Sequence, residues 1–361
     1  MQQDTSLQAL PHHDDIKFSV HRTAGLILLD RPRALNAISA DMAVSIRKAV
    51  SQWSQDDTIT HIVISASEPR AFCAGGDIRA LYEFVTEGGE DQLVPHFREE
   101  YLADADIYEC GKPVVALADG IVMGGGAGLM QSCTHSVVTD TTRFAMPESA
   151  IGLFPDAGAS LFLGRCPRSI ALLMGITGRI IGGADCLMLG LATVMVPSGR
   201  IVELRDALLA CEAAEIDDVL ERFRTDPGSA PLQEHRTEID HIFSGSDLCA
   251  MRERAGDLAR LKDSSLAQEI HAAMLNKCPM SMHVFLRLIE RSDEIVDLIS
   301  AYELDFHLAI RMTARDDFRE GIRAVLIDKT NDAVWHPAKL EDVTQSMLDH
   351  VFDRSGLPAI R

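Results

Sequence analysis

The sequence predicts an α/β fold over its first two hundred residues, followed by a helical C-terminal region. Two observations predict this class. Over residues 16–196, short apolar runs of strand length alternate with stretches that carry apolar residues at helical spacing. Over residues 201–327 the strand pattern is absent, and helical patterns continue with breaks near Pro227 and Pro279. The alternation alone does not separate a doubly wound parallel sheet from a spiral of strands and helices.

Individual elements follow from the apolar pattern. Strands are expected where β-branched and other apolar residues form short runs, at 25–29, 61–65 and 114–118. A helix is expected to begin at Ser39, a good N-cap residue, since one face then carries Met42, Ile46, Val50 and Trp53. In the C-terminal region, apolar residues at roughly helical spacing are expected in the core: Val284, Leu288, Ile289, Val296, Ile299, Leu304 and Leu308.

Composition excludes several classes of function. The chain has 361 residues, 47% of them apolar, enough to bury a full core in two domains or in one domain with an extension. Its net charge of −20 opposes binding to nucleic acids and anionic membranes. No apolar run approaches the length of a membrane span. The eight cysteines are scattered without a C-x-x-C pair, which argues against a disulfide framework and against a zinc site.

The chain termini and the cysteines predict a location. Residues 1–15 contain no lysine or arginine, so we expect neither a signal peptide nor a transit peptide there. The last residues, 358–361, are not a peroxisomal address. Scattered cysteines suit reduced thiols, and the expected location is therefore cytoplasmic.

Two carboxylates in an almost uncharged segment are the strongest candidates for chemistry. Glu148 and Asp156 lie within Met146-Pro147-Glu148-Ser149-Ala150-Ile151-Gly152-Leu153-Phe154-Pro155-Asp156. A carboxylate among apolar side chains loses solvation, and a protein tolerates this when the group is paired, hydrogen-bonded or part of a site. The structural alternative is that each acid caps a helix.

Two glycine turns precede this segment, and each follows an apolar strand. They are Phe72-Cys73-Ala74-Gly75-Gly76-Asp77 and Met123-Gly124-Gly125-Gly126. Glycine lets a ligand approach the main chain, and the first turn of a helix has unpaired N–H groups. Side by side, the two turns could direct two N–H donors at one oxygen, forming an oxyanion hole. Cys73 has no motif histidine beside it and is expected to be a small buried side chain.

Other catalytic patterns fail at identifiable positions. A dinucleotide fingerprint beginning at Gly124 and Gly126 would need glycine at position 129, which is Leu129. The sequence contains no G-x-S-x-G, so a serine nucleophile elbow has no support.

These motifs resemble those of the crotonase superfamily of acyl-CoA enzymes. The matching segments run in order along nearly the whole chain: LDRPRALNAIS (29–39), RAFCAGGDIR (70–79), FREEY (97–101), ADGIVMGGGAGL (118–129), FAMPESAIGLFPDAG (144–158) and DFREGIRAVLIDK (317–329). The resemblance implies a ββα spiral core over residues 16–200 with the coenzyme A and acyl site, and a mainly helical region over 201–361. Within the superfamily the motifs are closest to the 3-hydroxyisobutyryl-CoA hydrolases, which implies thioester hydrolysis in valine breakdown.

The resemblance assigns roles residue by residue. Gly76 and Gly125 match the two oxyanion N–H donors, Glu148 the catalytic glutamate and Asp156 the second acid beside it. Glu100 matches a further acidic residue that lines the acyl pocket. The sequence departs from the hydratase pattern where hydratases have a first glutamate, because the matching residue is Gly128. This departure argues against hydration of a double bond.

The resemblance also indicates where coenzyme A would bind. The segments that match 31–37 and 74–78 wrap the adenine and pantetheine, which makes Arg31, Leu35, Ala74, Asp77 and Ile78 candidate substrate-binding residues. Because the net charge would repel an anionic coenzyme, local cations must hold its phosphates, and the candidates are Arg31, Arg33, Arg79 and Lys329. For any one of these the more common interpretation is an ordinary solvated surface charge, and the matching segment 31–37 favours Arg31 over the others.

Three functions remain to be separated. The first is an acyl-CoA thioester hydrolase without a separate cofactor or metal, since coenzyme A is part of its substrate; a homo-oligomer is possible. The second is a hydratase or isomerase on the same fold. The third is a non-catalytic coenzyme A-binding protein, which would not need Glu100, Glu148 and Asp156 together.

Overall fold

A six-stranded sheet forms the larger of two sheets in the computed structural model, which describes residues 10–361. Its strand order is β1-β2-β3-β5-β7-β9; β1 runs antiparallel to β2, and the other neighbours are parallel. The strands are β1 (Ile16–His21), β2 (Ala24–Leu29), β3 (His61–Ala66), β5 (Val114–Ala118), β7 (His135–Thr139) and β9 (Val194–Val196). The strands predicted at 25–29, 61–65 and 114–118 are confirmed.

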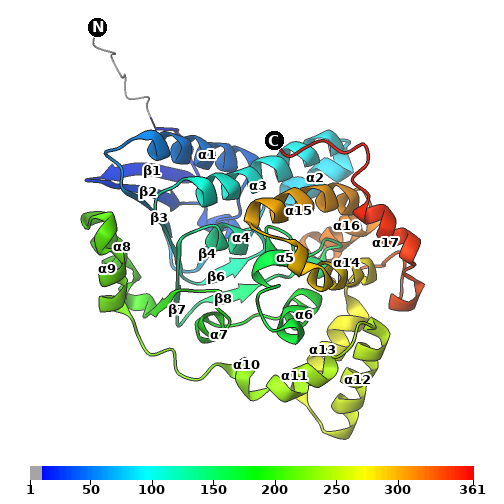
Figure 1. The fold of residues 1–361 in the computed structure, drawn as a ribbon. Coiled ribbons are helices and arrows are strands. Elements are labelled where there is room, and N and C mark those ends of the chain that lie inside the picture. The colour runs from blue at the N-terminus through cyan, green and yellow to red at the C-terminus, as the bar shows by residue number, and fades with distance from the viewer. Residues whose placement is uncertain (1–9) are drawn as a thin grey trace.

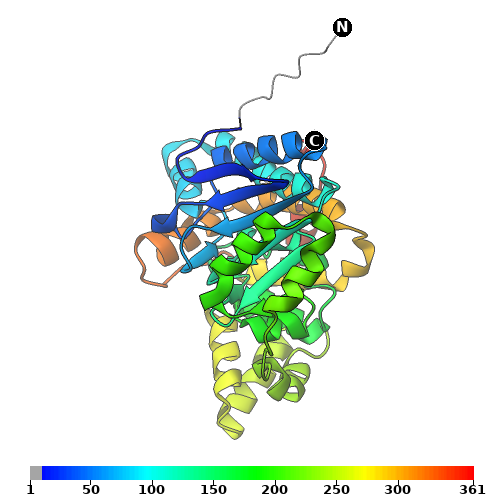
Figure 2. The same ribbon diagram turned by 90° about the vertical axis from the view of Figure 1, so that its left-hand side faces the viewer.

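A smaller parallel sheet lies beside the first, in the order β4-β6-β8 (Figures 1 and 2). Its strands are β4 (Ala71–Cys73), β6 (Ile121–Met123) and β8 (Arg143–Ala145). Each follows within a few residues of a strand of the larger sheet, so the chain adds one strand to both sheets at every turn. This arrangement is the ββα spiral that the family resemblance implied, and the predicted fold class is confirmed.

Seven helices accompany the sheets within residues 40–188 of the described chain. They are α1 (Ala40–Gln55), α2 (Ile78–Glu87), α3 (Leu93–Glu109), α4 (Gly125–Gln131), α5 (Ala159–Phe162), α6 (Arg168–Thr177) and α7 (Gly183–Met188). The predicted N-cap of α1 is present, because the Ser39 hydroxyl accepts a hydrogen bond from the Met42 N–H at 3.3 Å. Asp77 caps α2 in the same way, through the Ala80 N–H at 3.2 Å.

The elements described after residue 200 are helical. They are α8 (Ile201–Ala210), α9 (Ile216–Phe223), α10 (Pro231–Glu234), α11 (Arg236–Ile242), α12 (Leu248–Leu261), α13 (Ser265–Asn276), α14 (Pro279–Glu290), α15 (Leu298–Thr313), α16 (Asp316–Ile322) and α17 (Gln345–Phe352), with short 3₁₀ turns and a π-helical segment at Arg323–Ile327. No helix in the described chain is both long enough and apolar enough to cross a membrane.

The C-terminal helices return to the core and cover the small sheet's functional edge. Figure 1 shows α15 alongside α3, and the two helices are in contact. Phe97 and Tyr101 of α3 share a buried cluster with Tyr302 and Phe306 of α15, and Phe154 lies in the same cluster. The segment that carries Asp156 is therefore buried beneath helices that are distant from it in the sequence.

One predicted core residue is exposed. Val296 has 78% of its surface exposed, whereas Val284 and Leu288 are buried as expected. The reason is local, because Val296 lies in the connection between α14 and α15 and does not share a helix face with the other residues of the pattern.

Close packing of α6 on α14 gives a first prediction. A Cβ on Gly175 would overlap the ring of Phe285, although alanine is otherwise the better helix former by about 1 kcal/mol. We expect Gly175→Ala to lower the free energy of unfolding by about 1–3 kcal/mol, the usual cost of overpacking. Urea denaturation measures it. Gly199→Ala is the matched control, since a Cβ there would meet nothing within 4 Å; equal stability of both variants would contradict the prediction.

Candidate active site

The two glycine turns lie side by side at the ends of neighbouring strands. Gly76 follows β4 and Gly125 follows β6, and these strands pair in parallel. A Cβ on Gly125 would lie 3.4 Å from the Gly76 nitrogen. Among the described residues, neither N–H donates a main-chain hydrogen bond outside a helix or strand, and Gly125 is the first residue of α4. Both donors are therefore available to one acceptor, as an oxyanion hole requires.

Glu148 stands at the end of the third strand of the small sheet. Met123 of β6 pairs with Ala145 of β8, so the turn after β8 lies beside the turn after β6. The Glu148 side chain is only 5% exposed, and its Oε1 lies 2.7 Å from the point that a Cβ on Gly124 would occupy. Its other oxygen, Oε2, is buried without a hydrogen-bond partner among the described residues. A buried carboxyl oxygen without a partner is costly, and this makes Glu148 a candidate for a functional role.

Asp156 is held by a tyrosine that the sequence did not single out. The Tyr101 hydroxyl donates a short hydrogen bond to Asp156 Oδ2, and both side chains are buried. The Tyr101 ring stacks on Tyr302 of α15, with ring centroids 6.2 Å apart. Asp305, on the same helix, accepts a hydrogen bond from the Gly158 N–H at 2.8 Å. These contacts fix the orientation of the Asp156 carboxyl.

The predicted groups share one cavity of about 260 Å³. Glu100, Glu148 and Asp156 line it together with both glycine turns and an apolar wall. The C-terminal π-helical segment closes the wall with Val325 and Leu326, which the sequence reasoning did not identify although they lie within a matching motif. The remaining lining residues are Ala74, Gly75, Ile78, Leu81, Phe97, Met123, Gly124, Pro147, Ala150, Ile151 and Leu153.

Burial and repulsion between charges favour the protonated forms of Glu148, Asp156 and Asp104. Burial raises the pKa of Glu148 well above its usual range, and the charge of Asp156 raises it further. Burial likewise raises the pKa of Asp156 to about 7, with a further contribution from the charge of Glu100. The pKa of Asp104, behind the cavity, is raised by the same causes. Glu148 and Asp156 therefore titrate as a pair, because ionisation of Asp156 disfavours ionisation of Glu148.

Lys277 is the cation that approaches Glu148 from behind, and sequence reasoning missed it. Its Nζ lies 2.9 Å from the point that a Cβ on Gly178 would occupy, and Pro147 Cα lies 2.9 Å from the same point. The neighbouring Cys278 N–H donates to the Ser149 carbonyl at 3.0 Å, which fixes this junction against the Glu148 turn. Burial lowers the pKa of Lys277 to about 8, and the charge of Glu148 opposes that decrease.

The position of the hydratase glutamate has no room for a side chain. A Cβ on Gly128 would lie 2.6 Å from Ala157 Cβ and 2.9 Å from Asp104 Oδ2. Atoms this close would force the backbone to move, so the spacing around Gly128 excludes a glutamate in this arrangement.

The two segments expected to wrap coenzyme A are joined to each other. Ala74 N–H donates to the Leu35 carbonyl at 3.0 Å. Arg31 forms ion pairs with Asp77 at 2.7 Å and with Asp15 at 3.3 Å. Of the five predicted residues, Ala74 and Ile78 line the cavity that contains Glu148, whereas Arg31, Leu35 and Asp77 are not among its lining residues.

The remaining candidate cations are at the surface. Arg33, Arg79 and Lys329 are exposed, and Arg79 donates to the Leu326 carbonyl at 3.2 Å. That bond ties α2 to the segment that closes the acyl cavity. Cys73 is fully buried, as predicted, and burial raises the pKa of its thiol to about 12, so it is not a nucleophile.

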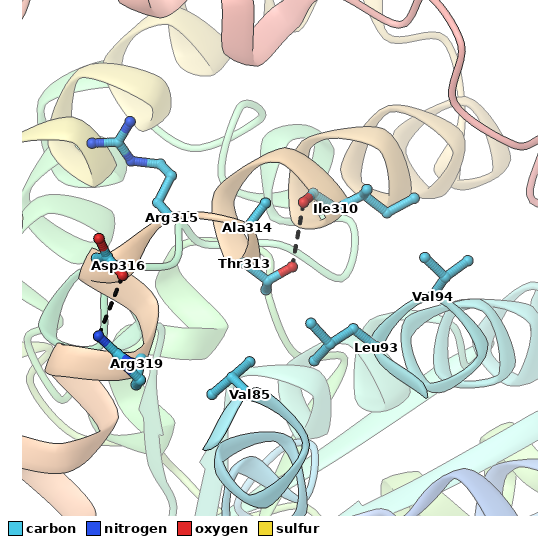
Figure 3. A pocket seen from close by; sticks show the side chains of 9 residues that line it. All are labelled: Val85, Leu93, Val94, Ile310, Thr313, Ala314, Arg315, Asp316 and Arg319. Carbon is cyan, nitrogen blue, oxygen red and sulfur yellow. Dashed lines mark hydrogen bonds and ion pairs between the residues drawn. The ribbon is translucent and has the colours of Figure 1, made fainter. Parts of the chain in front are cut away.

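A second hollow, of about 380 Å³, lies between α2 and α3 on one side and α15 and α16 on the other (Figure 3). The apolar side chains of Val85, Leu93 and Ile310 are among those that line it. Its Arg319 is paired with Asp316 at 3.4 Å. The hollow contains neither glycine turn nor any of the buried acids, and we assign no chemistry to it.

The fold and the paired glycine turns define a protein of the crotonase type. The chain belongs to the enoyl-CoA hydratase/isomerase family, whose family model matches residues 24–352. Among curated relatives, the mitochondrial 3-hydroxyisobutyryl-CoA hydrolase of Gallus gallus is 36% identical over 361 residues, covering 97% of this chain and 92% of the relative. The Homo sapiens protein of that name is 36% identical and covers 92% of this chain and 86% of its own.

Solved structures agree on the fold. A structure described as an enoyl-CoA hydratase from Rhodobacter sphaeroides 2.4.1 has a TM-score of 0.88 at 32% identity, covering 96% of this chain and 99% of its own. A second structure, described as a carnitinyl-CoA dehydratase from Mycobacterium thermoresistibile, has a TM-score of 0.89 at 30% identity and covers 97% of this chain and 99% of its own.

The relatives overturn one expectation. The hydrolases from Gallus gallus and Homo sapiens are mitochondrial by name, so the expectation of a cytoplasmic location is wrong. Reduced cysteines do not distinguish one reducing compartment from another. The other argument rested on residues 1–15, of which residues 1–9 lie outside the described part.

The raised pKa of Asp156 predicts how stability depends on pH. Between 3.8, the ordinary value, and about 7, the folded state binds the proton more tightly than the unfolded state, so stability falls as pH rises through this window. Asp156→Asn cannot ionise and should gain stability, by up to roughly 4 kcal/mol at pH 8 and by less at pH 5. Urea denaturation at both pH values tests this. Asp342→Asn, at an exposed aspartate, is the control; equal gains at both pH values would contradict the prediction.

Proposed function

We propose that the protein hydrolyses a short-chain 3-hydroxyacyl-CoA thioester, most specifically 3-hydroxyisobutyryl-CoA, to the hydroxy acid and coenzyme A. The observation that carries this proposal is the buried carboxyl of Glu148 beside two free N–H donors, at a site where the packing around Gly128 leaves no room for the first glutamate of the hydratase pattern. The 36% identity to 3-hydroxyisobutyryl-CoA hydrolases over almost the full chain supports the choice of substrate.

The geometry supports a simple sequence of steps. The thioester oxygen accepts hydrogen bonds from the Gly76 and Gly125 N–H groups, which stabilise the negative charge that develops on it. Glu148 then acts in one of two ways. As a general base it takes a proton from water, whose oxygen attacks the thioester carbon. As a nucleophile it attacks that carbon itself, giving a mixed anhydride that water cleaves. In both routes the C–S bond breaks and the thiolate leaves as coenzyme A after taking up a proton.

Asp156 is suited to the substrate's 3-hydroxyl. Its carboxyl lines the same cavity as Glu148 and is oriented by Tyr101. An ionised carboxylate accepts a hydrogen bond from a hydroxyl, and a site built for that bond rejects an analogue without the hydroxyl. The cavity of about 260 Å³, with Val325 and Leu326 in its wall, suits a short branched acyl group.

A hydratase or isomerase is the second candidate, favoured by the descriptions of the two similar solved structures. Hydration needs two acidic groups around one water. The first of these would stand at position 128, where the packing of Gly128 on Ala157 leaves no space for a side chain. A non-catalytic binding protein would have no reason to keep Glu148 Oε2 buried and unpartnered.

One assay separates these candidates. Thiol release from 3-hydroxyisobutyryl-CoA and isobutyryl-CoA is followed with a thiol reagent, and enoyl thioester absorbance is followed in parallel. We expect thiol release with a strong preference for the hydroxy substrate and no change in enoyl absorbance. A rise in enoyl absorbance without thiol release, which reports loss of water from 3-hydroxyisobutyryl-CoA, would establish the second candidate. No reaction in either assay would establish the third.

Removing the carboxylate of Glu148 gives the direct mutational test. Glu148→Gln keeps the volume but cannot take a proton or form an anhydride, so kcat should fall by at least about 10³-fold while the protein remains folded. Glu87→Gln, at an exposed position on α2, is the control and should retain full turnover. Near-normal turnover of Glu148→Gln would rule out this mechanism.

The charge of Lys277 should set the pH at which Glu148 becomes active. Lys277 lowers the pKa of Glu148, so without this cation the Glu148 pKa rises and the acidic limb of the kcat profile moves to higher pH. We expect this shift for Lys277→Met and a much smaller one for Lys277→Arg, which retains the charge. The measurement is kcat from pH 5 to 9, and an unchanged acidic limb in Lys277→Met would show that Lys277 has a structural role only.

A further inference from the structure

The Glu100 carboxyl lies directly against the oxyanion turns. A Cβ on Gly76 would lie 2.7 Å from Glu100 Oε2, and a Cβ on Gly125 would overlap Oε1. Negative charge on this carboxyl would therefore repel the negative charge that develops on the thioester oxygen. The charge state of Glu100 must matter to a reaction that uses these donors.

None of the titratable groups whose pKa the charge of Glu100 raises offers a compensating positive charge. They are Cys73 from β4, Tyr101 and Asp104 from α3, Glu148 after β8, and Asp156. Each of these side chains is neutral or negative in every protonation state. Among the described residues that line the cavity, none is a lysine or an arginine.

His96 is the base that contacts Glu100. It lies one turn earlier on α3, and its Nε2 is 3.5 Å from Glu100 Oε2. The His96 side chain is 3% exposed, and Nε2 is buried without a hydrogen-bond partner. Its ring packs edge-on against Phe97, with centroids 5.7 Å apart. Catalytic hydrogen bonds are often long in a protein without substrate and shorten when it binds. The carboxyl is thus the polar group placed to satisfy this nitrogen.

We propose that His96 is a positioning residue that holds the Glu100 carboxyl and shares one proton with it, so that the pair carries no net charge while the thioester oxygen is negative. This inference rests on the proposed thioester hydrolysis. The proton lies between Nε2 and Oε2 and remains in the pair while the oxyanion forms and collapses. Histidine suits this role because it is the side chain that exchanges a proton near neutral pH. Loss of the shared proton at high pH leaves the pair negative and slows the reaction.

A double-mutant cycle tests the pair. The four proteins are the wild type, His96→Phe, Glu100→Gln and the double variant, assayed from pH 6 to 10 with 3-hydroxyisobutyryl-CoA. His96→Phe should lower kcat by about tenfold at pH 8 with KM within about twofold, and should move the alkaline limb to lower pH. In the Glu100→Gln background, where no carboxylate remains, the same substitution should change kcat by less than about twofold.

The variant His96→Gln distinguishes a role in holding the Glu100 carboxyl in place from a role in sharing a proton with it. The amide of His96→Gln can donate to Glu100 but cannot exchange a proton, so it should restore KM and part of kcat without restoring the wild-type alkaline limb. His61→Gln is the control for loss of a buried histidine, since His61 Nε2 contacts the Leu208 carbonyl at 2.8 Å, away from the cavity. It should leave the alkaline limb in place. Independent effects of His96→Phe and Glu100→Gln on kcat, or an unmoved limb in His96→Phe, would overturn the proposal.

The cycle also separates this inference from the proposed function. If the wild type releases no thiol, the proposed function is wrong. The interaction between His96 and Glu100 is then measured from the free energies of urea unfolding of the same four proteins at pH 6 and pH 9. A shared proton gives a coupling between positions 96 and 100 at pH 6 that weakens at pH 9. Additive stabilities at both pH values would overturn the inference whatever the protein hydrolyses.

Discussion

The parallel register of the three-stranded sheet is the constraint on which the rest of the site depends. Cys73 pairs with Val122, and Met123 pairs with Ala145, so β4, β6 and β8 end at one edge. The chain leaves each strand into a turn that carries one functional group, either an N–H donor or the Glu148 carboxyl. Backbone hydrogen bonds of a sheet hold these turns more rigidly than loops could, and a site that stabilises charge in a transition state needs such rigidity. The rest of the chain covers this edge of the sheet and sets the pKa values of the acids that lie there.

Burying several acids in one place has an energetic cost, and the packing of the C-terminal helices produces that burial. Tyr302 and Phe306 pack over the segment that carries Asp156, and they exclude water from its carboxyl. Removal of water raises the proton affinity of the acids and also strengthens every interaction between charges. The same packing that makes the site reactive therefore works against the stability of the fold, as is common where chemistry needs charged groups in a dry cavity.

The sequence predicted the parts of the site that depend on local pattern. Glu148 and Asp156 were evident as isolated acids in an apolar segment, and the turns at Gly76 and Gly125 as glycines after strands. The spiral itself required the family resemblance, because strand–helix alternation is common to several α/β folds.

What could not be predicted depends on tertiary contact. Lys277 is more than a hundred residues from Glu148 in the sequence, and only the packing of the α13–α14 junction on the Glu148 turn brings the two together. The ion-pair partners of Arg31 could not be predicted either, because Asp77 is 46 residues away in the sequence and only the fold brings the two side chains together. Val296 was misplaced because a run of apolar residues at helical spacing continued across a break in the helix.

The contact between Gly128 and Ala157 has a consequence for the history of this family. Ala157 adopts a left-handed backbone conformation, with φ at 50°, which glycine accepts more readily than alanine. A Cβ at position 128 would meet the Ala157 carbonyl oxygen at 2.8 Å and Asp104 Oδ2 at 2.9 Å as well as the Ala157 methyl group. A lineage that exchanged hydrolysis for hydration would therefore have to move the backbone at Ala157 before position 128 could carry an acid. A tightly packed turn thus separates two enzyme chemistries that share a fold.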